Sequence, residues 1–180
     1  MVPNKTDIMI YREELDSIPI NQPTFNIAKI IKDCPTLQRL VDLGVDLSQW
    51  EERDFNGQNM EIAIRIDFDA DVKPRVQWLI DHGVDLNNQA VIFTSNPNIF
   101  NISLEQMNSV VEYLKAKKFP RRSISEIILG SYGKWLSFSV VDIDSKLGYF
   151  QNNFKLSGNE VRQLAKNEPN LIIWAGVPFQ

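Results

Sequence analysis

The chain repeats one pattern of apolar runs and turns at a spacing of 35 to 39 residues. Residues 37–47 align without gaps on residues 76–86, and seven of these eleven positions are identical. The same layout returns after residue 111 and again after residue 147. A period of this length is typical of proteins that stack short supersecondary units, so it restricts the fold more than any other feature of the sequence.

Each repeat is predicted to contain two helices and a short third turn of helix. In residues 76–100, apolar residues recur at i, i+3 and i+4 from Val76, which places them on one helical face. Gly83 is expected to end this helix, and Asn87 or Asn88 is expected to cap the next one. Helices this short cannot bury their apolar faces alone, so the units are expected to stack into a continuous core.

Other helix starts are marked by a serine followed three residues later by Glu or Gln, which is the pattern of a capping box. The pattern occurs at Ser103–Gln106, Ser123–Glu126 and Ser157–Glu160. Upstream, Pro35 is expected to open a helix that Gly44 closes. Residues 51–66 fit a helix or, through alternating isoleucines, a strand; the repeat favours the helix.

The third element of a repeat is expected to begin at a proline, because Pro97 and Pro169 cannot continue the preceding helix but can open a new one. Gly133 stands at this position in the central unit. The apolar pairs after the prolines and one aromatic residue of each first helix are expected to fill the core. These are Ile99, Phe100, Leu171 and Ile172, with Trp78, Tyr113 and Tyr149.

The sequence therefore predicts an all-α fold of about four stacked units over residues 23–175. Residues 1–22 are predicted to form a largely disordered tail, and residues 176–180 a short C-terminal tail. No charged residue follows Glu168, and apolar residues gather there: Leu171, Ile172, Ile173, Trp174, Val177 and Phe179. A solenoid needs a polar terminal cap, so we expect a truncated repeat domain whose apolar end binds a protein partner.

Composition excludes several classes of protein. The single cysteine, Cys34, cannot form an intramolecular disulfide, and one cysteine with one histidine argues against a zinc site. No apolar run approaches the roughly 20 residues of a membrane span. The acidic N-terminus lacks the arginines of an import signal.

Charge is divided unevenly along the chain. Residues 1–100 carry 9 Lys or Arg and 16 Asp or Glu, whereas residues 101–180 carry 10 and 7. A polyanion is therefore expected to bind the second half. The densest basic cluster there is Lys115, Lys117, Lys118, Arg121 and Arg122, with Lys134, Lys146 and Lys155 as extensions. One interpretation is phosphate binding. The other is that lysines are favoured at a helix C-terminus and are simply solvated there.

No pattern of catalytic or metal-binding residues is present. Alternating aspartates from Asp67 imitate the start of a calcium loop, but Val72 and Trp78 occupy the positions of its glycine and glutamate. His82 is expected at a helix end, without a nucleophile motif beside it. We therefore expect no enzyme, no cofactor, no metal and no small-molecule substrate.

Several short stretches resemble the mitochondrial transcription termination factor (mTERF) family. They are LQRLVDLGVDLS at 37–48, IRIDF at 64–68, NPNIF at 96–100, FSV at 138–140 and LGYFQ at 147–151. The resemblance covers about residues 23–175. It implies a left-handed superhelical solenoid of helical repeats, of which this chain holds about four.

The resemblance also implies a mitochondrial protein that binds mitochondrial DNA or structured RNA. Its expected role is regulation of transcription, including termination, or ribosome assembly. A second hypothesis is a protein-interaction scaffold without direct nucleic-acid binding, which the acidic first half and the apolar C-terminal end favour.

Overall fold

The computed structural model describes residues 27–174, which fold into helices joined by short turns. Among these residues there is no strand, so the helical prediction for residues 51–66 is confirmed. The predicted tails, residues 1–22 and 176–180, lie outside the described residues. The α-helices are α2 (Ile27–Asp33), α3 (Pro35–Asp42), α4 (Ser48–Glu52), α5 (Gln58–Arg65), α6 (Lys73–Asp81), α7 (Leu86–Ser95), α8 (Leu104–Ala116), α9 (Arg121–Gly130), α10 (Val140–Asn153), α11 (Gly158–Asn167) and α12 (Pro169–Trp174). Three shorter helical turns are η1 (Phe68–Val72), η2 (Pro97–Asn101) and η3 (Lys134–Ser137).

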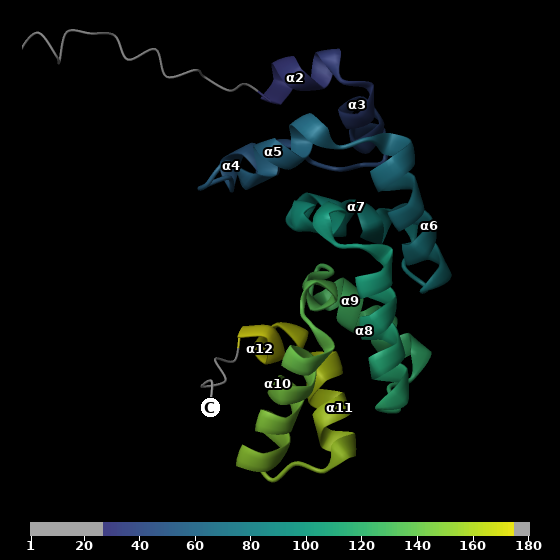
Figure 1. Cartoon of the computed structure of the whole chain (residues 1–180), viewed down its shortest axis with the longest axis vertical. Helices are drawn as coiled ribbons and strands as arrows, with labels where there is room; N and C mark the ends of the chain where they lie inside the picture. The colour runs from purple at the N-terminus through teal and green to yellow at the C-terminus, as the bar shows by residue number, and fades with distance from the viewer. Residues whose placement is uncertain (1–26, 175–180) are drawn as a thin grey trace, which may run out of the picture.

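These elements form four consecutive units in a curved stack (Figure 1). The first helices of the units are α3, α6, α8 and α10, the second are α4, α7, α9 and α11, and the third elements are α5, η2, η3 and α12. In Figure 1, α6 and α8 run along the outer side of the arc, whereas α7 and α9 lie nearer its hollow. The predicted helical-repeat fold is thus confirmed for the described residues.

The turns between first and second helices share one backbone geometry. Each contains a residue in the left-handed conformation: Gly44 (φ 92°), Gly83 (φ 84°), Lys118 (φ 65°) and Lys155 (φ 53°). The next residue's N–H bonds back to a helix carbonyl in every case: Val45 to Leu40, Val84 to Leu79, Phe119 to Leu114 and Leu156 to Gln151, at 2.9–3.1 Å. This is the Schellman arrangement, which satisfies carbonyls that a helix end leaves free. The sequence repeat is therefore a repeat of helix-ending geometry.

Side chains of one unit bond to the main chain of the next. The indole nitrogen of Trp50 donates to the carbonyl of Phe93 at 3.0 Å, and that of Trp135 donates to the carbonyl of Pro169 at 3.0 Å. Both indoles are buried. Buried donors need such partners, so these bonds fix the register of one unit on its neighbour.

The helix caps agree only in part with the sequence prediction. Ser157 and Glu160 form the complete capping box at α11. Ser103 caps α8, but the side-chain amide of Gln106 donates to the carbonyl of Phe138 at 2.6 Å, at the end of η3. Gln106 therefore links the first and third elements of its unit instead of closing its own helix end.

Two predicted caps are wrong. Asp85 caps α7, because its carboxylate accepts the backbone N–H of Asn88 at 2.9 Å; Asn87 and Asn88 lie inside the helix. Ser123 does not start α9, which begins two residues earlier after Pro120. Pro120 has the extended backbone of an N-cap residue and places the helix start upstream of the serine.

The predicted core is mostly confirmed. Ile99, Phe100, Ile172 and Trp78 are buried. Leu171, however, is 49% exposed, and Tyr113 and Tyr149 are only partly buried. The Tyr113 hydroxyl donates to the Asp144 carboxylate at 2.7 Å, which holds its polar end at the surface.

Gly133→Ala is expected to destabilise the fold by about 1–3 kcal/mol. Gly133 has φ 73°, and an added Cβ would lie 3.1 Å from Ile99 Cδ1 and 3.3 Å from Ile92 Cγ2. The positive φ excludes proline at this position, and the close approach of the neighbouring unit leaves little room for a Cβ. Gly148→Ala in α10 is the control: nothing lies within 4 Å, and the change should stabilise by about 0.5–1 kcal/mol. Urea unfolding measures both, and equal effects would contradict the packing argument.

Candidate nucleic-acid interface

Five exposed basic residues meet at the turn between α8 and α9. Lys115 lies in the last turn of α8, Lys117 is its C-cap, Lys118 is the left-handed residue, and Arg121 and Arg122 open α9. We call these five residues the α8–α9 basic cluster. The chain reversal brings them together because Phe119 is buried beneath the turn and fixes it to the core.

Three members of the cluster are paired with carboxylates. The pairs are Lys115 with Glu112 at 2.7 Å, Lys117 with Asp144 at 2.7 Å, and Arg122 with Glu126 at 3.0 Å. The basic side chains of these pairs are half or more exposed. Exposed pairs contribute only about 0–1 kcal/mol, so an anion competes with them at little cost.

The other two members have no carboxylate partner within residues 27–174. Arg121 donates from its guanidinium to the carbonyl of Asp81 at 2.7 Å, at the end of α6. A neutral carbonyl leaves the charge of Arg121 uncompensated. The ammonium group of Lys118 is exposed and forms no ion pair in this part of the chain.

Helix α11 adds two basic residues that the sequence analysis did not include. Arg162 donates to the carbonyl of Lys117 at 3.4 Å, and the ammonium of Lys166 lies 3.3 Å from the Glu126 carboxylate. The two residues are four apart and therefore share one face of α11. This four-residue spacing, together with the repeat that stacks α11 on α9, could have indicated from the sequence that both residues lie beside the cluster.

The structure does not bring Lys134 or Lys146 into this cluster. Lys134 begins η3, beyond the far end of the ten-residue α9, which is about 15 Å long. Lys146 donates to the carbonyl of Ile173 at 2.9 Å and lies 5.4 Å above the ring of Phe138. A nucleic-acid role for Lys134 stays a prediction.

Asp144 connects α10 to the end of α8. It accepts bonds from Lys117 and from the Tyr113 hydroxyl, and these bonds lower the pKa of its carboxyl. Burial, followed by the bond to Asp144, raises the pKa of the Tyr113 hydroxyl. Tyr113 thus remains a neutral donor, and Lys117 is held by Asp144 of α10 and lies over the ring of Tyr113 in its own helix.

Asp144→Asn is expected to remove a small acid-dependent part of the stability. A carboxyl whose folded pKa lies below its ordinary 3.8 stabilises the fold above that value and loses this contribution as pH falls through the folded pKa. Because the Asp144 side chain is 55% exposed, we expect less than about 1 kcal/mol. Thermal unfolding from pH 6 to pH 2 measures it; identical pH profiles for both proteins would contradict it.

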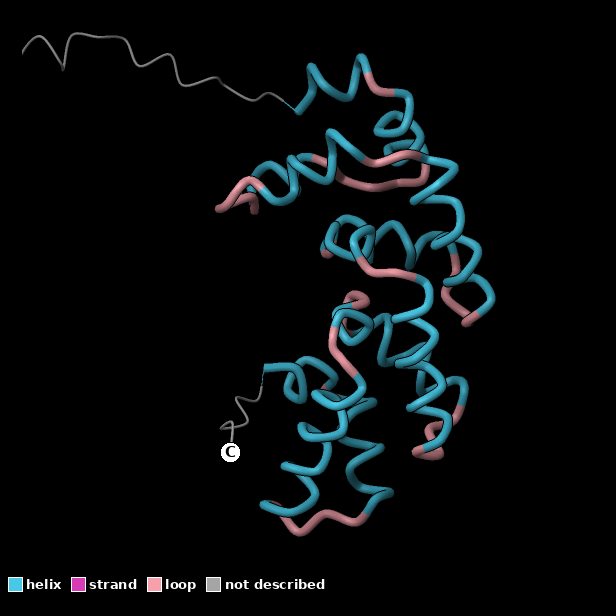
Figure 2. The backbone as a smooth tube through the Cα atoms, in the orientation of Figure 1, coloured by secondary structure: helices cyan, strands magenta, loops and turns pink. Residues whose placement is uncertain are grey.

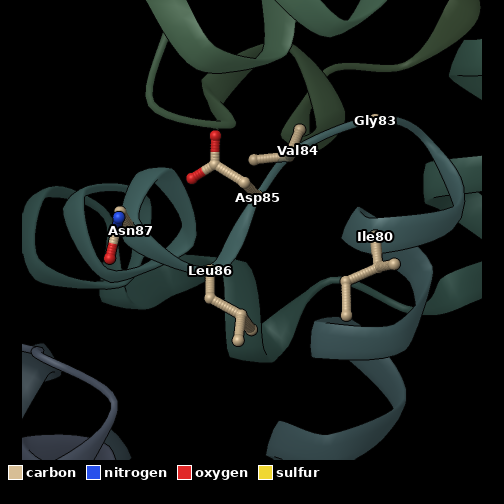
Figure 3. Close-up of a pocket in the computed structure, with 6 residues that line it drawn as sticks. All are labelled: Ile80, Gly83, Val84, Asp85, Leu86 and Asn87. Carbon is tan, nitrogen blue, oxygen red and sulfur yellow. The ribbon is translucent and has the colours of Figure 1, made fainter.

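A shallow hollow lies at the turn between α6 and α7 (Figure 3). Its lining residues are Ile80, Gly83, Val84, Asp85, Leu86 and Asn87. In Figure 3 the side chains of Ile80 and Leu86 lie on one side of the turn and the Asp85 carboxylate on the other. Asp85 is already used as a helix cap, so the hollow offers apolar contact and no converging polar groups.

The remaining polar candidates have structural roles. Asp67 caps η1 by accepting the N–H of Ala70 at 2.8 Å, and the ring of His82 stacks on Trp78 with centroids 3.9 Å apart. No group of three metal-binding side chains occurs between residues 27 and 174. In the same range, no helix is long and apolar enough to span a bilayer.

Comparison with known proteins identifies the relatives of this chain. The sequence pattern of the mTERF family matches residues 26–177. The transcription termination factor 3, mitochondrial, of Drosophila melanogaster is 40% identical over 152 residues, which cover 84% of this chain and 42% of the fly protein. The proteins of the same name from Mus musculus and Rattus norvegicus are each 33% identical, over 81% and 82% of this chain and 34% of their own lengths.

The chain therefore spans well under half the length of the relatives it matches. The family is one of non-catalytic factors, which agrees with the expectation that this chain is not an enzyme. The match includes every helix in the described range, from α2 to α12. The chain belongs to the mTERF family.

Proposed function

We propose that this chain is a nucleic-acid-binding part of a regulator of mitochondrial gene expression. Its α8–α9 basic cluster would contact the phosphate backbone of mitochondrial DNA or structured RNA. The observation that carries the proposal is the convergence of this cluster with Arg162 and Lys166 from the next unit. Seven basic side chains thereby share one surface with only three partner carboxylates.

The specific role, the location and the handedness of the superhelix are proposed from the similarity to known relatives. The names of the fly and mouse relatives include transcription termination and mitochondrial location. We extend both to this chain and propose ribosome assembly as a further role within gene expression. The left-handed sense of the superhelix is proposed on the same ground, and the curved stack of units is compatible with it.

Binding to duplex DNA and to structured RNA across a salt series tests the proposal. If the five residues of the α8–α9 basic cluster each neutralise one phosphate of a duplex, a plot of log K against log salt should have a slope of about −4.5. This value is the steepest slope expected from five contacts. Filter binding between 50 and 200 mM salt gives this slope. Absence of salt-dependent binding to both polymers would refute the proposal.

A protein-interaction scaffold is the second candidate. The hollow at the α6–α7 turn favours this candidate, since its apolar side chains Ile80 and Leu86 are 45% and 50% exposed. The net negative charge of residues 1–100 also favours a protein partner over a polyanion there. Leu171 adds an exposed apolar side chain near the C-terminal end. A folded protein that binds neither DNA nor RNA at 50 mM salt would favour this candidate.

A further inference from the structure

Two of the four equivalent left-handed turn positions carry lysine where the others carry glycine. Lys118 occupies the α8–α9 turn and Lys155 the α10–α11 turn, 37 residues later. The two positions occupied by glycine lie in the acidic first half. In Figure 2 the α8–α9 turn lies on the outer side of the arc and the α10–α11 turn at its end.

The left-handed conformation is unfavourable for a side chain with a Cβ, so glycine would stabilise both turns better than lysine does. Both lysine side chains are exposed, and neither ammonium has a carboxylate partner among residues 27–174. Lys115 and Lys117, by contrast, are each paired at 2.7 Å. The two strained positions thus hold lysines whose charge is fully available to an anion.

Arg162 joins the two turns into one surface. Its guanidinium donates to the carbonyl of Lys117, next to Lys118, at 3.4 Å. The same guanidinium nitrogen lies 3.5 Å from the position of a Cβ on Gly158, at the start of α11 and three residues after Lys155. The Arg162 guanidinium therefore lies between the C-terminal end of α8 and the beginning of α11.

We propose that Lys118, Arg162 and Lys155 form a phosphate-binding edge that follows the backbone of one nucleic-acid strand. The inference rests on the proposed function and assigns its contacts: the edge binds phosphates. Lys115 instead pairs with Glu112 within α8, and Lys117 holds the end of α8 against Asp144 of α10. Neighbouring helices pack about 8–10 Å apart, a distance comparable to roughly three 3.4 Å steps along a strand. Consecutive turns can therefore contact phosphates of the same strand.

The test compares two double variants with equal loss of charge. Lys118→Gly with Lys155→Gly should raise the thermal midpoint because glycine suits both turns. The same variant should flatten the salt slope by about 1.8 and lower affinity about tenfold per lysine at 50 mM salt. Lys115→Gln with Lys117→Gln should leave the slope within about 0.5 of the parent.

Each outcome separates the edge from the wider function. Equal losses in the two double variants, or no loss in the glycine variant, overturn the edge while the parent's salt-dependent binding upholds the proposed function. Absence of salt-dependent binding by the parent overturns both. A gain variant adds an independent measurement: Gly83→Lys places a lysine at the equivalent turn, where Ser125 leaves ordinary contact distances of 3.8 and 3.9 Å. It should increase the magnitude of the slope by about 0.9, and an unchanged slope counts against the edge.

Discussion

Replacing Arg75 with methionine is expected to lower the free energy of unfolding by about 3–5 kcal/mol. Arg75 is only 8% exposed, and its guanidinium donates to three carbonyls: Ile99 at 3.0 Å, Asp71 at 2.7 Å and Ile102 at 2.6 Å. Methionine fills a similar volume but donates nothing. Buried acceptors without a donor each cost about 1–3 kcal/mol.

Arg65→Met is the matched control, because Arg65 is exposed and bonds to Asn101, the last residue of the η2 segment that also contains Ile99. That change should cost less than about 0.5 kcal/mol. Urea unfolding followed by circular dichroism compares the two variants. Similar losses in both would show that the three carbonyls near Arg75 find other donors.

Reversing the charge of the α8–α9 basic cluster should reduce nucleic-acid affinity by about a thousandfold or more at 50–100 mM salt. The variant carries Glu at Lys115, Lys117, Lys118, Arg121 and Arg122. Five positive charges beside the bound phosphates become five negative charges that repel them, so the slope of log K against log salt should approach zero. Retained affinity in this variant would place the binding surface elsewhere.

Its control reverses five exposed basic residues of the first half, which change the net charge equally. These are Lys29, Lys32, Arg53, Arg65 and Lys73. We expect less than about a tenfold loss from this control, because charges more than a Debye length of about 10 Å from the bound polymer are largely screened at 0.1 M salt. Equal losses in both variants would mean that net charge, and not the cluster, determines binding. Circular dichroism must show that both variants remain helical.

The sequence predicts the helices well because their signals are local. Apolar spacing and the glycine and proline positions locate α6, α7 and η2 without knowledge of their neighbours. Helix caps were predicted less well, since several residues near each start can accept the same N–H bonds. Asp85 captures the cap of α7 because it stands one residue before Leu86, the first residue of the helix.

The candidate interface was predicted only where it is contiguous in sequence. Lys115 to Arg122 are visible as a cluster, but Arg162 joins them only after α11 packs on α9. Likewise, nothing in the sequence distinguishes Arg75, which is buried, from Arg65, which is exposed. Two of the three carbonyls that accept from Arg75 come from residues 24 and 27 positions later, and only the stack brings them to it.

The hydrogen bonds between units have a consequence for how such a chain can change. Trp50 and Trp135 each bond to a main-chain carbonyl in the following unit. Every residue type supplies a carbonyl, so the donor constrains one side of the contact and leaves the side chain opposite free to vary. Substitutions in one unit then need no compensating partner in the next. Units of this kind can diverge one at a time, which lets a single unit acquire basic residues while its neighbours remain acidic.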